Sequence, residues 1–286
     1  MTIITRFAPS PTGRLHLGHA LSALLSHDRA RGADGRFYLR IDDIDGARSR
    51  DDYVAAAMED LRWFGLMWDD APVYQSARLA LYEAALVRLS AAGLIYPCFC
   101  TRADIAAEVA ASASAPHGDF GPVYPGTCRS LSDAERLARA HQPHSWRLDM
   151  AKAVALAGPL HWEDEREGII LAMPEKAGDI ILARKDAPAS YHLASTIDDA
   201  DMGVTHVIRG RDLFASTHIH RLLQALLGLP TPLYHHHALV VDSMGKRLAK
   251  RDQATELAAL RAQGFEGWAL VEDLRRGVLP AGYSLA

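Results

Sequence analysis

The sequence predicts an α/β protein built around a parallel β-sheet, and three observations support this. Residues 36–41 (RFYLRI) alternate between apolar and polar side chains, which is the period of a strand. Leucines and alanines recur at helical spacing over residues 17–25, after a short apolar opening segment. Strand, turn, helix and strand thus follow one another within about 40 residues, which is the order of a βαβ unit. Two strands joined in this way lie parallel in one sheet.

Further patterns predict helices that cover this sheet. The string SRDD at residues 49–52 is typical of a capping box and predicts that a helix begins there. Ser76 is placed to cap a second helix, which we expect to end near Gly93. Both helices strengthen the prediction of a doubly wound sheet.

The region that follows departs from this pattern. Residues 95–178 contain paired cysteines, a stretch of small residues and only short apolar segments. Strand patterns return near residues 204–210, and a helical pattern returns in residues 218–228 (HIHRLLQALLG). The sequence therefore predicts an inserted subdomain within one larger domain. The three predicted parts are 1–94, the first half of the sheet domain; 95–178, the insertion; and 179–286, the second half.

Composition limits the classes of function. The 286 residues are 49% hydrophobic and 23% charged, as in ordinary globular proteins. No apolar run reaches about 18 residues, and no basic segment followed by an apolar one opens the chain, so we expect a cytoplasmic protein. A net charge of −4 argues against sequence-independent binding of nucleic acid. Basic strings such as KRLAKR at residues 246–251 still leave RNA binding open.

The turn at residues 6–19 (RFAPSPTGRLHLGH) has the features of an anion site. A strand that ends in prolines and a glycine and then enters a helix leaves backbone N–H groups without partners at the helix start, where anions bind well. Gly18 permits close approach of a ligand, while His16 and His19 beside it could donate to phosphate oxygens. An isolated pattern of this kind is also typical of a helix cap with two partly exposed histidines.

The complete string resembles the HIGH signature of class I aminoacyl-tRNA synthetases, in the form found in glutamyl and glutaminyl enzymes. Residues 240–252 (VVDSMGKRLAKRD) are similar to the second signature of that family, the KMSKS loop. Aligned on Leu248, Arg247 stands at the first lysine, Ala249 at the serine and Lys250 at the second lysine. The resemblance implies a Rossmann-type catalytic domain that binds ATP with Mg²⁺.

Amino-acid activation explains why both signatures are needed. It brings an anionic carboxylate onto the α-phosphate of anionic ATP and expels pyrophosphate, so negative charge must be neutralised. By resemblance, His16 and His19 are catalytic and form the ATP site together with Gly18. Lys250, together with Arg247, would follow the β- and γ-phosphates alongside Mg²⁺. A basic string alone is more typical of a solvated loop.

A glutamate pocket needs cations for the side-chain carboxylate and an acceptor for the α-ammonium group. The resemblance implies that Arg6, Ser10, Tyr191 and Arg209 contact the amino acid. Among these, Arg6 and Arg209 would grip the distal carboxylate and Tyr191 would add a hydroxyl contact.

The ammonium position departs from the family pattern. The family's RIEDTD is RIDDID here, so Asp42 replaces a glutamate and its carboxylate stands one methylene further from the ligand. A water bridge or a small backbone shift could compensate.

The three cysteines of the chain suggest a metal site. Cys98 and Cys100 form a CxC pair and Cys128 follows after a loop, which gives three soft ligands where tetrahedral zinc needs four. Candidates for the fourth ligand are His117, Asp119 and Tyr124. Chemistry alone favours His117, and free thiols remain an alternative. In the short glutamyl-type proteins, CxC followed by YxxxC binds zinc, so the resemblance implies Tyr124 as the fourth ligand.

The length of the chain distinguishes it from full-length glutamyl enzymes. Only 34 residues follow Asp252, which leaves no room for an anticodon-binding domain. The chain thus resembles the short paralogues, which activate glutamate without tRNA and esterify it onto queuosine at the wobble position of tRNA(Asp). The implied partners are ATP, L-glutamate and the anticodon arm of tRNA(Asp), and we expect a monomer.

Two alternatives remain from the sequence. One is a different nucleotidylyltransferase of the HxGH superfamily, against which Arg6, Arg209 and Tyr191 weigh. The other is a non-catalytic paralogue that binds tRNA or an amino acid as a regulator, motivated by Asp42 and by the altered KMSKS-like loop.

Overall fold

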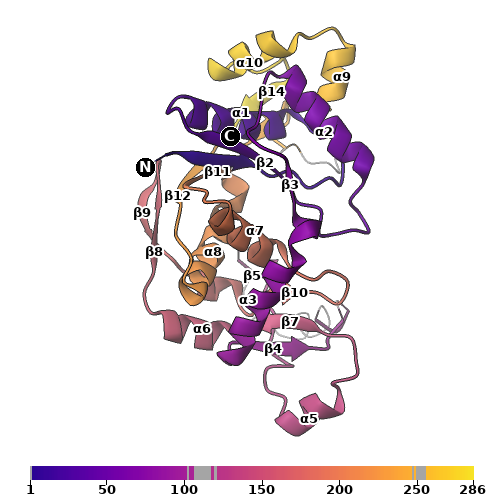
Figure 1. Cartoon of the computed structure of the whole chain (residues 1–286), viewed down its shortest axis with the longest axis vertical. Coiled ribbons are helices and arrows are strands. Elements are labelled where there is room, and N and C mark those ends of the chain that lie inside the picture. The colour runs from indigo at the N-terminus through magenta and orange to yellow at the C-terminus, as the bar shows by residue number, and fades with distance from the viewer. Residues whose placement is uncertain (1, 102, 106–116, 119–120, 247, 249–255) are drawn as a thin grey trace.

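A mostly parallel sheet runs through the centre of the protein (Figure 1). The computed structural model describes residues 2–101, 103–105, 117–118, 121–246, 248 and 256–286. Its central strands are β1 (Ile4–Phe7), β2 (Arg36–Ile41), β3 (Val73–Tyr74), β8 (His161–Asp164), β9 (Gly168–Leu171), β11 (His206–Gly210) and β12 (Leu233–His237). All of these pair in parallel except β9, which is antiparallel to β8. The predicted α/β class with a parallel sheet is thereby confirmed.

The two halves of the chain meet in the middle of this sheet. The Thr205 N–H donates to the carbonyl of Ile4 at 2.9 Å, and the Ile4 N–H donates to Thr205 Oγ1 at 2.8 Å. These bonds place β11, at the edge of the sheet β11-β12-β8-β9, beside β1, at the edge of the sheet β1-β2-β3. The order reverses between β1 and β11, and in open α/β sheets ligands bind at such a reversal.

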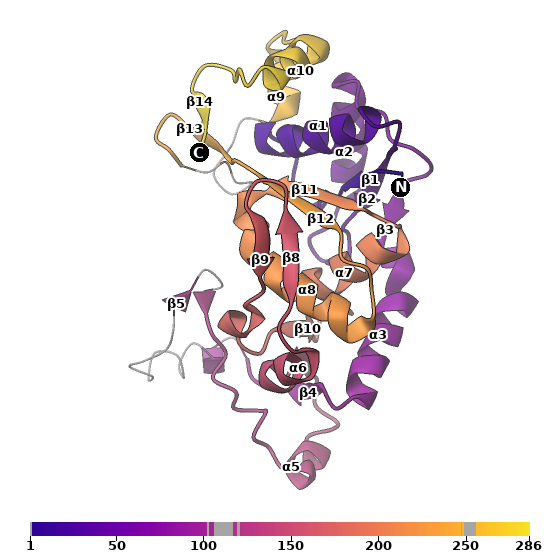
Figure 2. The same cartoon turned by 90° about the vertical axis from the view of Figure 1, so that its left-hand side faces the viewer.

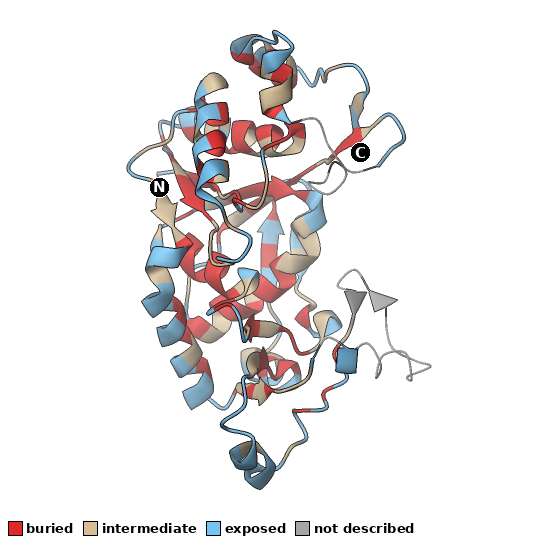
Figure 3. Cartoon of the chain, turned by 90° about the vertical axis from the view of Figure 1, so that its right-hand side faces the viewer, coloured by how far each residue is buried: buried red, intermediate tan, exposed pale blue. Residues whose placement is uncertain are grey.

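Helices cover both faces of the sheet (Figures 1 and 3). One face carries α1 (Leu17–Arg31), α2 (Asp51–Trp63), α9 (Leu257–Ala262) and α10 (Gly267–Arg275). The other carries α3 (Leu79–Ala91), α6 (Met150–Ala157), α7 (Tyr191–Asp201) and α8 (Phe214–Leu227). Each layer buries its own apolar core against the strands. None of the helices in the described ranges is long and apolar enough to cross a membrane.

Two helix starts differ from the sequence prediction. Helix α2 begins at Asp51, as expected, but its N-cap is Arg50 and no side chain caps it. The predicted capping box is therefore wrong, and Asp51 and Asp52 instead place negative charge beside the positive end of the helix dipole. Ser76 is also not a cap, because its hydroxyl donates to Asp43 at 2.6 Å from inside a 3₁₀ turn, Gln75–Arg78.

The segment after α3 forms a smaller antiparallel sheet at the lower end of the molecule (Figure 1). Its strands are β4 (Ile95–Cys98), β7 (Ser145–Leu148) and β10 (Ile181–Ala183), with the short α5 (Asp133–Ala138) beyond them. Two short strands, β5 (His117–Gly118) and β6 (Gly121–Pro122), pair with each other. The β8 and β9 hairpin also comes from residues 95–178, yet it extends the central sheet (Figure 2).

The C-terminal residues close the opposite end of the molecule. Strand β14 (Tyr283–Leu285) pairs antiparallel with β13 (Val240–Asp242), which follows β12. The first residue of α10, Gly267, packs closely against the end of α2. A Cβ built on Gly267 would lie 2.0 Å from the carbonyl oxygen of Trp63. Only glycine permits this approach.

We expect Gly267→Ala to destabilise the fold by about 1 to 3 kcal/mol, because α10 must move away from α2 to admit the methyl group. Thermal unfolding followed by circular dichroism measures the change. Gly46→Ala is the matched control, since a Cβ there meets nothing within 4 Å. Equal unfolding midpoints for the two variants would show that the contact does not constrain the packing.

Candidate active site and metal centre

A cavity of about 460 Å³ opens at the carboxyl ends of β1 and β11, where the strand order reverses. It brings together every described residue that was predicted to bind ATP or glutamate. These are Arg6, Ser10, His16, Gly18, His19, Asp42, Tyr191 and Arg209. Arg247 and Lys250 lie outside the described residues, while Leu248 between them is buried and lines the cavity.

The two histidines form a reciprocal cap at the start of α1. His16 Nδ1 accepts from the Gly18 N–H at 3.2 Å, and His19 Nδ1 accepts from the His16 N–H at 3.2 Å. Their ring centroids are 3.8 Å apart. A Cβ on Gly18 would approach the His16 ring to 3.1 Å, so the absence of a side chain at Gly18 leaves room for the ring in this position.

This cap fixes which nitrogen of each ring carries a proton. Because Nδ1 of both His16 and His19 accepts a hydrogen bond, the neutral rings hold their proton on Nε2. Both rings line the cavity, so each offers an N–H donor to an anion bound there. The helix-cap alternative and the anion-site prediction therefore describe the same arrangement.

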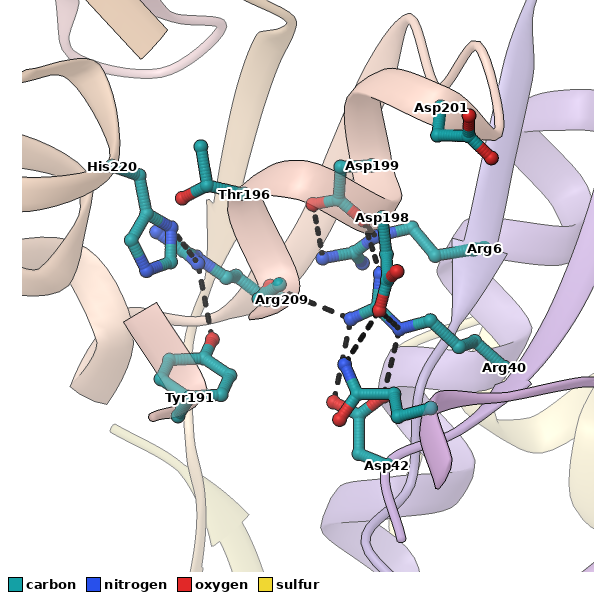
Figure 4. Close-up of polar contacts among 12 residues, drawn as sticks. Arg6, Arg40, Asp42, Tyr191, Thr196, Asp198, Asp199, Asp201, Arg209 and His220 are labelled. Carbon is teal, nitrogen blue, oxygen red and sulfur yellow. Dashed lines mark hydrogen bonds and ion pairs between the residues drawn. The ribbon is translucent and has the colours of Figure 1, made fainter. Parts of the chain in front are cut away.

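An ion-pair network lies along one side of the cavity (Figure 4). Arg6 pairs with Asp199 through Nε at 2.8 Å and Nη2 at 3.2 Å. Arg40 is fully buried and contacts Asp199 at 2.6 Å and Asp42 at 2.7 Å. Asp198 lies 3.8 Å from the same guanidinium. These carboxylates hold the pKa of Arg40 well above its usual range despite the cost of burial.

Asp42, the residue that departs from the family pattern, belongs to this network. Both of its oxygens accept from Arg40, at 2.7 and 3.3 Å. Burial raises the pKa of Asp42, and the neighbouring Asp198 acts in the same direction. The shorter side chain is thus anchored to Arg40 while it lines the cavity.

Arg209 differs from the other two arginines, because its hydrogen-bond partners among the described residues are all neutral groups, two of which, Tyr191 and His220, appear in Figure 4. Nε donates to His236 Nε2 at 3.1 Å, and Nη2 donates to Thr217 Oγ1 at 2.5 Å. Nη1 donates to Tyr191 Oη and to His220 Nδ1, each at 3.3 Å. None of the carboxylates that the structure describes lies within 4.0 Å of this buried guanidinium.

The histidines near Arg209 are held neutral. Burial and the charge of Arg209 lower the pKa of His236 to about 3. The same two causes lower the pKa of His220 well below its usual range. His192, which contacts His220 at 3.3 Å, has its pKa lowered to about 4 by burial and by Arg209. At neutral pH the positive charge in this group belongs to Arg209.

The predicted metal ligands also come together. The sulfur atoms of Cys98, Cys100 and Cys128 lie within 4.8 Å of one another, and those of Cys100 and Cys128 are 3.5 Å apart. The Tyr124 hydroxyl lies 3.5 Å from two of these sulfurs. A tetrahedral zinc ion with bonds of about 2.3 Å separates its sulfur ligands by about 3.8 Å, so the cluster fits zinc after a small adjustment. The side chain of His117 and residue Asp119 are not described.

The surroundings of the cysteines suit a metal. Burial raises the pKa of the Cys100 thiol to about 12, so without a cation this group stays protonated. Cys98 and Cys128 are buried among Tyr96 and Tyr124. A divalent cation in this cluster would displace the thiol protons and convert three weak polar groups into strong ligands.

Several residues of the site escaped the sequence analysis. They are Arg40, Asp164, Asp198, Asp199, Thr217, His220 and His236. One signal was present, since Asp198 and Asp199 stand side by side in a helix whose neighbours are apolar, and two buried acids require buried cations.

We expect about one zinc ion per chain in the purified protein and its loss in Cys128→Ser, because the two remaining cysteine sulfurs and a phenol do not complete a tetrahedral site. Elemental analysis by mass spectrometry measures the content. Metal-free wild-type protein with an unchanged melting temperature would contradict a structural metal.

We expect acid to destabilise the protein once the pH falls below about 6.5. A histidine that is neutral in the folded state and has a lowered pKa binds its proton only on unfolding, so stability is complete above the unfolded pKa and falls towards the folded one. For His192 the window runs from about 6.5 down to about 4. His192→Asn should recover about 1 kcal/mol at pH 5.

Urea unfolding from pH 4 to pH 8 measures this slope. His141→Asn, which changes an exposed histidine, is the control and should leave the slope unchanged. An identical slope in His192→Asn and wild type would remove His192 as its source.

Comparisons with known proteins show the family to which this chain belongs. Residues 2–284 match the family described as tRNA synthetases class I (E and Q), catalytic domain. The glutamyl-Q tRNA(Asp) synthetase of Rhodobacter capsulatus is 51% identical over 96% of this chain and 99% of that protein. Its counterpart in Symbiobacterium thermophilum is 45% identical over 91% of this chain and 81% of its own length.

A solved glutamate-tRNA synthetase from Elizabethkingia anophelis has a TM-score of 0.75 and 30% identity. That match covers 93% of this chain but 54% of the other, so the chain spans about half the length of that enzyme. The resemblance predicted from residues 6–19 is confirmed. The chain belongs to the glutamyl-Q tRNA(Asp) synthetases, within the class I synthetases for glutamate and glutamine.

Proposed function

We propose that this protein activates L-glutamate with ATP and Mg²⁺ to glutamyl-adenylate without tRNA, and then transfers the glutamate to queuosine in tRNA(Asp). The relatives named above support this proposal, and one observation in the site supports it most directly. Arg209 is buried in contact with neutral groups only, so its charge is available to an anion in the cavity. The side-chain carboxylate of glutamate is such an anion.

The amino acid would be held at both ends. Tyr191 accepts from Arg209, so its own O–H remains to donate to the carboxylate beside that guanidinium. Arg6 adds Nη1, which has no hydrogen-bond partner among the described residues, while Asp199 balances its charge. At the other end, Asp42 offers carboxylate lone pairs to the α-ammonium group.

Activation joins a glutamate carboxylate oxygen to the α-phosphorus of ATP and breaks the bond to pyrophosphate. The helix cap orients the Nε2–H groups of His16 and His19, which are proposed to stabilise the developing charge. Mg²⁺ bound by the phosphates would supply further neutralisation. Arg247 and Lys250 are proposed to follow the leaving pyrophosphate.

Transfer would take place on the other side of the amino acid. A second cavity of about 480 Å³ shares Ser10, Asp42 and Tyr191 with the first and extends towards the small antiparallel sheet. A queuosine hydroxyl that enters here can attack the adenylate carbonyl, forming an ester and releasing AMP as its proton leaves. This cavity supports a route for the acceptor that does not cross the ATP site.

We further propose that the three predicted parts of the chain act together in this reaction. Residues 1–94 and 179–286 would supply the activation site, while residues 95–178 would hold a structural zinc ion and meet the anticodon arm. A monomer is the proposed form, because each of the residues named above comes from one chain.

A non-catalytic binding protein is the second candidate. The observation that favours it is Asp42, whose oxygens both contact Arg40 already. If that carboxylate does not reach the ammonium group, glutamate could bind through Arg209 alone without being activated.

We expect ATP–pyrophosphate exchange with glutamate in the absence of tRNA, and much less with glutamine or aspartate, because only glutamate places a carboxylate at Arg209. Arg209→Gln should lower kcat/KM for glutamate at least about 100-fold, which is the scale of a lost charge-assisted pair. Arg211→Gln, which removes an exposed arginine paired with Glu167, is the matched control and should keep wild-type exchange.

If the protein binds glutamate but shows no ATP–pyrophosphate exchange with glutamate, glutamine or aspartate, the non-catalytic candidate is favoured. Unchanged exchange in Lys250→Ala would remove the loop from the activation step. Queuosine-containing tRNA(Asp) with radiolabelled glutamate then tests the transfer, with tRNA that lacks queuosine as the control.

A further inference from the structure

Arg209 is held by two neighbouring strands rather than by a counter-ion. Arg209 on β11 and His236 on β12 are register partners, and Arg209 Nε lies 3.1 Å from His236 Nε2. Asp164, at the end of β8, lies on the far side of the same ring, with Oδ2 2.7 Å from His236 Nδ1. Three adjacent parallel strands thus supply a carboxylate, an imidazole and a guanidinium that contact one another in sequence.

The direction of these hydrogen bonds is fixed. Arg209 Nε can only donate, so His236 Nε2 must accept and the proton of the neutral ring must lie on Nδ1. That proton is donated to Asp164, which also accepts the His236 backbone N–H at 3.1 Å. Burial opposes the charge on Asp164, but the bonds from His236 and from two turn N–H groups lower its pKa and keep it ionised.

The His236 ring is confined on its sides as well. Tyr234 lies parallel to it with centroids 5.9 Å apart, and Phe214 and Trp162 pack against it at 5.0 and 5.8 Å. His236 is 1% exposed, so no solvent rearrangement can relax the ring into the other tautomer.

We propose that Asp164 and His236 are positioning residues for glutamate recognition: Asp164 fixes the tautomer of His236, and His236 then holds the Arg209 guanidinium in the cavity with its charge unpaired. A direct carboxylate contact would fix Arg209 equally well, but it would compete with the substrate carboxylate. The neutral His236 ring orients the Arg209 guanidinium without neutralising its charge. This inference rests on the proposed function only in taking glutamate as the ligand of Arg209.

Neutral acceptors also hold the other side of the Arg209 guanidinium. Nη1 donates to His220 Nδ1, which leaves the His220 proton on Nε2 for donation to His192 Nδ1, each contact being 3.3 Å (Figure 4 shows the first of these). Thr217 Oγ1, which accepts from Nη2, lies 3.2 Å from His236 Nε2 and can donate to it. All four hydrogen-bond partners of Arg209 therefore present acceptors without bringing a negative charge into contact.

The chain of hydrogen bonds from Asp164 through His236 to Arg209 is called the relay below, and Asp164→Asn tests it. The side chain can keep one oxygen on the turn N–H groups of Arg166 and Glu167, but its amide now faces His236 Nδ1 as a donor. The ring must then carry its proton on Nε2, where it opposes the Arg209 Nε–H. We expect the glutamate Kd, measured by calorimetry, and the glutamate KM in exchange to rise at least about tenfold, with the ATP KM within about twofold of wild type.

A second change separates positioning from simple structural support. Gln at position 236 can turn its amide oxygen towards Arg209 whatever group stands at position 164. The double variant Asp164→Asn, His236→Gln should therefore bind glutamate at least about threefold more tightly than Asp164→Asn alone. Glu165→Gln is the matched control, since Glu165 contacts Arg29 and His235 on the same hairpin but not Arg209, and its glutamate Kd should equal that of wild type.

The inference is overturned if the double variant binds no better than the single one, or if Asp164→Asn changes the glutamate and ATP constants equally. If Asp164→Asn does not fold, His236→Leu and His236→Gln replace it, with tenfold weaker binding expected for leucine and near wild-type binding for glutamine; equal binding by the two rejects the relay. Wild-type protein that binds glutamate without exchange rejects the proposed function and leaves the relay open to the binding test. Wild-type protein that binds no glutamate rejects both.

Discussion

The buried contact between Arg40 and its carboxylates is the interaction on which the site depends. Arg40 comes from β2 in the first half of the chain, and Asp198 and Asp199 come from α7 in the second. A buried charge without its partner is far more costly than the pair, so the network fixes how the halves meet. The same contact anchors Asp42 and lets Asp199 orient Arg6.

Charge is distributed unevenly across the cavity as a result. On the β2 side, the guanidinium groups of Arg6 and Arg40 are paired with carboxylates. On the β11 side, Arg209 is surrounded by neutral groups. Burial of its charge without a counter-ion is unfavourable, and an anionic ligand would offset this cost. This distribution of charge supports the proposed ligand, which has a carboxylate at one end and an ammonium group at the other.

Sequence analysis identified the site better than the packing around it. The turn at residues 6–19 and Arg209 could be located because local strings carry them, and the cavity unites them. The capping box at Ser49 and the cap at Ser76 were wrong because tertiary partners, such as Asp43 for Ser76, took their place. His236 and Asp164 were invisible because they meet through the pairing of β8 with β12, and the pairing of distant segments leaves no mark in a single sequence.

Tyr124 contacts the cysteine cluster and also lines the second cavity. Its hydroxyl lies among the cysteine sulfurs, and its side chain lines the second cavity, where the Arg147 guanidinium lies 3.8 Å from its ring. Whatever fixes that ring for a metal also shapes the cavity wall. By thermodynamic reciprocity, a ligand in this cavity that prefers the fixed ring must tighten the metal by the same factor by which the metal tightens the ligand. A metal bound by the cysteines would therefore be coupled to this cavity through the Tyr124 side chain.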